Sequence, residues 1–133
     1  MRENRAVDDL VTWLRAQLDD DERVARAVED RSAPWDGQWV NDGGGALRTY
    51  NGWVLVHNAG QLITRGLLDH IARHDPARVL AEVDAKRRIL DRWKDSQDNA
   101  LPPEALLALD EVVKLLALPY ADRPGYRDEW RPA

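Results

Sequence analysis

The feature that most constrains the fold is a change of residue pattern between residues 35 and 64. Glycines there separate short segments rich in Trp, Val, Leu, Thr and Tyr, whereas the flanking parts of the chain repeat apolar residues at helical spacing. Asn51-Gly52 is a strong hairpin signal, because a type I′ turn needs positive φ at both central positions. We therefore predict a small antiparallel β-meander. The expected strands are Gln38–Asn41, Ala46–Tyr50, Trp53–His57 and Gln61–Thr64.

The segment before the meander predicts a long amphipathic helix over residues 7–31. Val7, Leu10, Leu14 and Leu18 recur at the spacing of one helix face. The helix should stop by residue 33, because the following proline disfavours helical geometry in the residue before it.

Helices also follow the meander, over residues 66–95, with a break at Asp75-Pro76. Aspartate is a good N-cap, and proline is tolerated at the first helical position, where its missing N–H costs nothing. The first helix is expected to end near His74 and the second near Asp95.

The last predicted helix, residues 102–118, is apolar on nearly every side, so it must be covered nearly all round. One way to cover it in a small protein is a second copy of the chain. The expected homodimer interface comprises Leu106, Leu109, Val113 and Leu116. The tail, residues 119–133, alternates aromatic and charged residues and is expected to pack back over the body.

These patterns predict an α+β fold within a single domain, residues 1–133. A long N-terminal helix precedes the meander at 35–64, and two to three C-terminal helices are expected to pack on the sheet.

Composition narrows the class of protein. The chain has no cysteine, so disulfides and thiolate chemistry are excluded. It has no apolar run of the ~20 residues that cross a bilayer and no signal-peptide pattern, so we expect a cytoplasmic protein without a membrane partner. A net charge of −5 argues against a general nucleic-acid binder.

One basic segment, residues 65–94, carries a net charge of +3. A phosphate could be held at the helix start after Asp75, where N–H groups are expected to be free. The candidate anion-binding residues are Arg73, Arg78, Arg87 and Arg88. The candidate residues for stacking on a base are Trp35, Trp39 and Trp53. The alternative is a solvated charged face, because Asp84–Arg88 and Arg87–Asp91 are spaced for intrahelical ion pairs. This alternative is favoured, since a run of charges on a helix is more often a solvated face than a binding site.

His70 and His74 stand four residues apart on one helix face, a spacing that suits a divalent metal. Ile71 occupies the position where metalloproteases carry glutamate. The third ligand would be Asp75, or alternatively Asp69 or His57. The competing interpretation is favoured: His74 sits at a helix C-terminus and His70 covers the sheet. No hydroxyl lies in a G-x-S-x-G motif, so no catalytic residue and no cofactor is assigned.

The block HIARHDPARVLAEVDAKRRIL at residues 70–90, with Pro34-Trp35 before it and the tail to Pro132 after it, resembles a family of small uncharacterised proteins of actinobacteria and their phages. A more distant likeness, carried by Pro34-Trp35 and the helix start at Asp69, extends to phage accessory proteins. The resemblance implies a mobile-element or accessory context and brings no catalytic residues.

Three hypotheses follow. The first is a non-enzymatic interaction module, a homodimer that modulates an unidentified host protein. The second is a binder of nucleotides or other phosphorylated small molecules. The third is a metal-dependent hydrolase built on the histidine pair.

Overall fold

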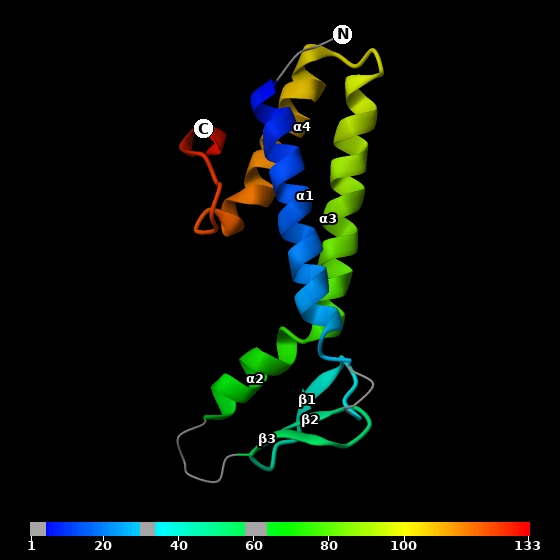
Figure 1. The fold of residues 1–133 in the computed structure, drawn as a ribbon, viewed down its shortest axis with the longest axis vertical. Coiled ribbons are helices and arrows are strands. Elements are labelled where there is room, and N and C mark those ends of the chain that lie inside the picture. The colour runs from blue at the N-terminus through cyan, green and yellow to red at the C-terminus, as the bar shows by residue number, and fades with distance from the viewer. Residues whose placement is uncertain (1–4, 30–33, 58–63) are drawn as a thin grey trace. The chain divides into compact units, whose positions relative to one another are not determined.

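The computed structural model describes residues 5–29, 34–57 and 64–133 (Figure 1). They form two compact units. The helical unit comprises Met1–Asp20 and Asp84–Ala133, and the sheet unit comprises Asp21–Val83. Two long helices, α1 (Arg5–Arg26) and α3 (Pro76–Gln97), contribute residues to both units. The structure combines these helices with a three-stranded antiparallel sheet, so the α+β class is confirmed.

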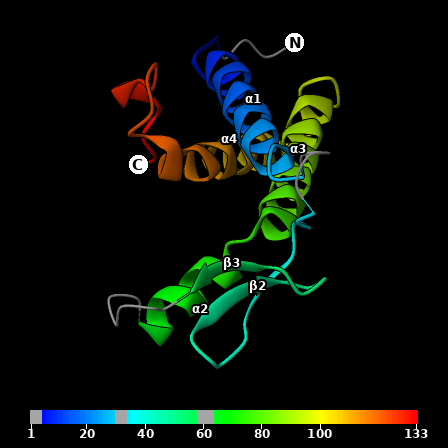
Figure 2. The same cartoon turned by 60° about the horizontal axis from the view of Figure 1, so that its bottom comes forward.

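In the helical unit, the first part of α1 lies beside the last part of α3 (Figures 1 and 2). Arg15 and Asp91 form an ion pair at 2.9 Å, and Arg87 and Asp19 form another at 2.7 Å. The helix α4 (Pro103–Ala117) completes this unit, followed by two 3₁₀ turns, η1 (Leu118–Tyr120) and η2 (Asp128–Trp130). Its fully buried residues include Leu10, Leu14, Leu18, Leu90 and Val113.

A buried polar contact joins α3 to α4. The indole N–H of Trp93 donates to Asp110 Oδ1 at 2.9 Å, and the two residues are 4% and 5% exposed. A carboxylate taken out of water needs such a donor, because an unpaired buried charge is costly. The contact therefore fixes which side of α4 faces the core.

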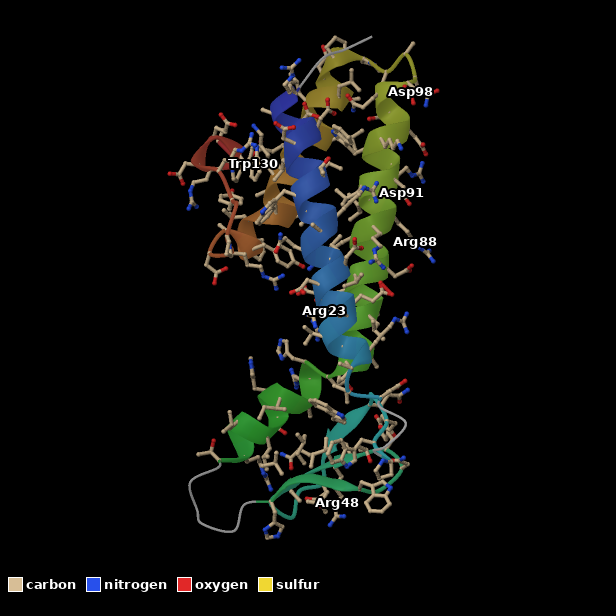
Figure 3. The ribbon with its side chains drawn as sticks, viewed as in Figure 1. Arg23, Arg48, Arg88, Asp91, Asp98 and Trp130 are labelled. Atoms are coloured by element: carbon tan, nitrogen blue, oxygen red, sulfur yellow. The ribbon has the colours of Figure 1, made fainter. Side chains whose placement is uncertain are left out.

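The tail packs back over α1, as predicted. The rings of Trp13, Tyr126 and Trp130 lie with centroids 5.5 to 5.6 Å apart, and Figure 3 shows Trp130 beside α1. The Trp13 indole N–H donates to the carbonyl of Pro124 at 3.0 Å. Gly125 has a φ of +91°, and a Cβ there would lie 2.8 Å from Trp13 Nε1, so only glycine fits without strain.

The sheet unit contains three antiparallel strands in the order β1 (Trp39–Asn41), β2 (Ala46–Thr49) and β3 (Val54–His57). Helix α2 (Arg65–Arg73) covers one face, as Figure 2 shows. Leu47 and Leu68 are each 1% exposed, and the Asn41 side-chain amide donates to Asp69 Oδ1 at 2.8 Å. Of the C-terminal helices predicted to pack on the sheet, α2 does so, whereas α4 belongs to the helical unit.

The predicted hairpin at Asn51-Gly52 forms, but its turn is centred on Tyr50 and Asn51 instead of Asn51 and Gly52, because the Gly52 N–H donates to the Thr49 carbonyl at 3.0 Å. Gly52 has a φ of +97°, and the Thr49 N–H donates to the Trp53 carbonyl at 2.9 Å across the Asn51-Gly52 turn. Between β1 and β2, Asp42 Oδ1 accepts from the N–H groups of Gly44 at 2.8 Å and Ala46 at 3.2 Å.

The predicted C-terminal end of the first helix was wrong. Helix α1 ends at Arg26 and not near residue 31. The chain then forms turns in which an N–H group bonds to the carbonyl three residues back instead of four, as Glu29 does to Arg26 at 3.1 Å. The expected strand 61–64 lies outside the described residues except for Thr64. That residue caps α2 instead, with its hydroxyl accepting from the Leu67 N–H at 3.2 Å.

Within the described part of the chain, no helix is long and apolar enough to cross a membrane.

Candidate functional site

The histidine pair is brought together, but not as a metal centre. The rings of His70 and His74 lie with centroids 4.3 Å apart, and His74 Nδ1 lies 2.7 Å from the His70 carbonyl oxygen. One ring nitrogen of His74 is therefore used by its own helix. Both residues are exposed at the C-terminal end of α2, which agrees with the competing interpretation of His74.

Asp75 serves the fold at both carboxylate oxygens. Oδ1 accepts from the Arg78 N–H at 2.9 Å, which caps α3, and Oδ2 accepts from the Trp39 N–H at 3.0 Å. Asp69, the alternative third ligand, accepts from Asn41. Across the described ranges, no three His, Cys, Asp or Glu side chains gather in a way that could hold a metal ion.

The predicted anion site at the start of α3 has no free N–H group in the first turn. Pro76 has none, Ala77 donates to the Gly37 carbonyl at 2.9 Å, and Arg78 donates to Asp75. The next residue, Val79, donates to the Asp75 carbonyl at 3.1 Å. An anion would have to displace these bonds, so the geometric basis for the anion-binding prediction is missing.

Three of the four candidate arginines form ion pairs. Arg78 contacts Glu82 at 2.9 Å, Arg88 contacts Asp84 at 3.0 Å, and Arg87 contacts Asp19. Arg73 forms no ion pair with any residue that the structure describes. Figure 3 shows Arg88 and Asp91 along α3. This pattern is that of a solvated charged face.

The three candidate stacking tryptophans lie in the sheet unit. Trp35 is 42% exposed and Trp53 is 52% exposed, whereas Trp39 is half-buried and its indole N–H donates to the Asp36 carbonyl at 3.2 Å. No ring contact joins them to one another in the described part of the chain. The structure therefore leaves them as separate side chains and not as a stacking platform.

The predicted dimer residues fall mainly on the inner side of α4. Val113 is 0% exposed, so it serves the core of its own chain, and Leu106, Leu109 and Leu116 are half-buried. Leu109 also lines a hollow of 580 Å³ together with Leu101.

The exposed apolar residues of α4 are different ones. Leu107 is 66% exposed, Leu115 is 53% exposed and Val112 is 38% exposed. Ala108 is also exposed, and these four residues lie on one side of the helix around the half-buried Glu111; this side is here called the outer face of α4. The sequence could not predict which residues form this face, because the pattern of a helix that is apolar on nearly every side does not show which side is buried.

Two residues of the sheet unit also escaped the sequence prediction. Glu29 and Tyr50, which is 67% exposed, both line a cavity of 270 Å³. Neither belongs to a motif, so no sequence signal pointed to them.

A family model described as "Family of unknown function (DUF6221)" matches residues 7–132. The chain therefore belongs to this family, which agrees with the resemblance to an uncharacterised family. No curated protein matches the chain, and no solved structure matches it.

Proposed function

We propose that this DUF6221 protein is a non-enzymatic interaction module that forms a homodimer through the outer face of α4. The observation that carries the proposal is the group of four exposed apolar residues on one side of α4, Leu107, Ala108, Val112 and Leu115. Single exposed apolar residues are ordinary on a protein surface, but a contiguous patch marks an interaction site. Covering the remaining exposed area of each large side chain would stabilise the complex by roughly 1 kcal/mol.

Two charges near opposite ends of this helix favour a second copy in antiparallel orientation. Glu104 lies in the first turn of α4, and Lys114 lies in the last turn. When Leu107 faces the partner's Val112 across a two-fold axis, Glu104 lies beside the partner's Lys114, and the reverse pair forms as well. A parallel arrangement would bring like charges together. The central Ala108 is small, so the two helices can approach closely.

The first experiment measures the molar mass in solution by size-exclusion chromatography with light scattering. We expect a dimer at micromolar concentration. The double variant Leu107→Ser/Leu115→Ser should be a folded monomer, because both side chains are exposed in the single chain. Leu67→Ser is the matched control, since Leu67 is 45% exposed on α2, and it should remain dimeric.

A charge exchange tests the orientation. Glu104→Lys alone should weaken the dimer, and Glu104→Lys combined with Lys114→Glu should restore it. A wild-type chain that stays monomeric at about 100 μM contradicts the homodimer. The mobile-element resemblance would then make a host protein the alternative occupant of the same face.

The other two hypotheses have less support. Nucleotide binding would need N–H groups that α3 has already used, and a metal-dependent hydrolase would need Asp75, which already caps α3. No specific observation favours either over the interaction module.

A further inference from the structure

We propose that the cavity between the end of α1 and the start of α3 binds an organic cation, an alkylammonium or guanidinium group. The cavity lies wholly within the sheet unit, whereas α4 belongs to the helical unit, so this proposal does not depend on the homodimer. Its walls come from α1, the turn at residues 36–38, Tyr50 and the first residues of α3.

The size and floor of the cavity limit what can enter. Its volume is 270 Å³, just below the ~300 Å³ at which pockets for drug-sized ligands begin. One long side chain or one small amine fits such a volume. Ala25, Ala77 and Leu80 supply apolar surface, against which the alkyl stem of a lysine or arginine can lie while its charged head stays at the rim.

The charges at the rim favour a cation. Glu29 forms no ion pair with any described residue. Its Oε1 lies so close to Gly37 that a Cβ added to this glycine would be only 3.1 Å from it. Arg26, the cation of the lining, is held by Glu22 at 2.9 Å. The cavity therefore offers an unpaired carboxylate and no unpaired cation among its described lining residues.

A second carboxylate strengthens this bias. Asp36 accepts hydrogen bonds from the backbone N–H groups of Gln38 at 3.0 Å, Tyr50 at 3.3 Å and Asn51 at 2.9 Å, so its side chain is fixed in place. The α3 terminus offers little to an anion, because the Ala77 N–H is bound to the Gly37 carbonyl. Tyr50 adds an exposed ring at the rim, whose face attracts cations.

The test follows the backbone amide signals of Gly37 and Ala77 in a proton–nitrogen correlation NMR spectrum. The probes are ethylguanidinium and the capped tripeptide acetyl-Gly-Arg-Gly-amide, with propanol as the neutral control and inorganic phosphate as the anionic control. We expect saturable shifts with both cations and none with propanol or phosphate. Tighter binding of the tripeptide assigns the site to a basic side chain of a partner, and tripeptide binding that is no tighter than that of ethylguanidinium assigns it to a free small cation.

Two variants connect the response to the cavity. Glu29→Gln keeps the size of the side chain and removes its charge, so cation binding should weaken about threefold or more. Ala77→Leu fills the floor and should abolish the shifts. Asp98→Asn removes an exposed carboxylate from the helical unit and should change nothing.

Three outcomes overturn the proposal. The first is no response to either cation up to about 10 mM, where a site with millimolar Kd is nearly saturated. The second is equal cation binding by the wild type and Glu29→Gln. The third is a stronger response to phosphate than to the cations. If Glu29→Gln disturbs the end of α1, the rim variant Tyr50→Ala replaces it, with the same expected weakening.

Discussion

Asp75 and Trp39, thirty-six residues apart, are joined by a hydrogen bond of 3.0 Å from the backbone N–H of Trp39 to Asp75 Oδ2. The other oxygen of the same carboxylate caps α3 through the Arg78 N–H. The Asp75 side chain therefore pairs an N–H group at the start of α3 that would otherwise lack an acceptor. It also fixes β1 against this helix. This relationship explains why the fold needs aspartate at a position where asparagine or serine would cap the helix alone.

Asp75→Ala should lower the free energy of unfolding by about 1–3 kcal/mol, since it removes a helix cap and leaves a half-buried N–H without an acceptor. Urea denaturation followed by circular dichroism measures the loss. Asp84→Ala is the control, because among the described residues Asp84 is paired with Arg88 alone, in an exposed ion pair, and the change should cost less than about 1 kcal/mol. Equal effects of the two changes would show that the helix cap and the link to Trp39 together contribute no more than an exposed ion pair.

Gly125→Ala should destabilise the tail by two separate effects. The residue has a φ of +91°, which an alanine adopts only with strain, and the added Cβ would lie 2.8 Å from Trp13 Nε1. We expect a loss of about 1–3 kcal/mol and a change in tryptophan fluorescence, as Trp13 moves away from the Pro124 carbonyl.

Gly43→Ala separates the two effects. Gly43 has a φ of +78°, but a Cβ there would meet nothing within 4 Å, so it carries the backbone strain without the collision. Its cost should be about 1 kcal/mol, and its tryptophan fluorescence should not change. If both alanine variants melt at the same temperature, the tail does not press against Trp13 as described.

The elements that the sequence predicted best are those fixed by local chemistry. The break at Asp75-Pro76 depends on a cap and a proline, and the hairpin at Asn51-Gly52 depends on a positive φ, so both were predicted correctly. The end of α1 was not, because Pro34 sets only a limit beyond which the helix cannot continue. The structure ends it earlier, at Arg26.

The candidate sites were harder to predict, because they depend on what each side chain contacts across the fold. Asp75 had the right chemistry for a metal ligand, but the strand that uses its second oxygen lies far away in sequence. The apolar face of α4 was expected, yet its phase is set by the Trp93–Asp110 contact, which the sequence cannot reveal. Likewise, nothing in the sequence indicated that Trp13 is the residue on α1 against which the aromatic tail packs.

Asp42 should make the stability of the sheet unit depend on pH. The side-chain hydrogen bond from Arg48 lowers the pKa of Asp42 below 3.8, and the N–H groups of Gly44 and Ala46 act in the same direction. A carboxyl group with a lowered pKa stabilises the fold above its unfolded pKa, and this contribution is lost as the pH falls through the folded pKa. Asp42→Asn should therefore melt at a lower temperature than the wild type near neutral pH, and the difference should shrink as the pH falls below 3.8.

An NMR titration of the Asp42 carboxyl group checks the cause. Arg48→Gln should raise the pKa of Asp42 part of the way towards 3.8, since the two backbone donors remain. A pKa that is unchanged in Arg48→Gln would mean that the ion pair between Asp42 and Arg48, 2.7 Å long in the structure, does not persist in solution.

Trp93→Phe should test whether the contact with Asp110 holds α4 against α3. Phenylalanine keeps much of the buried aromatic surface but removes the indole N–H that donates to Asp110 Oδ1 at 2.9 Å. The loss of this donor to a carboxylate that is 5% exposed should cost about 2–4 kcal/mol in the free energy of unfolding. The double variant Trp93→Phe/Asp110→Leu should recover part of that loss, because it removes the buried charge together with its donor. A double variant that is less stable than Trp93→Phe alone would show that Asp110 stabilises the helical unit through its other contacts rather than through Trp93.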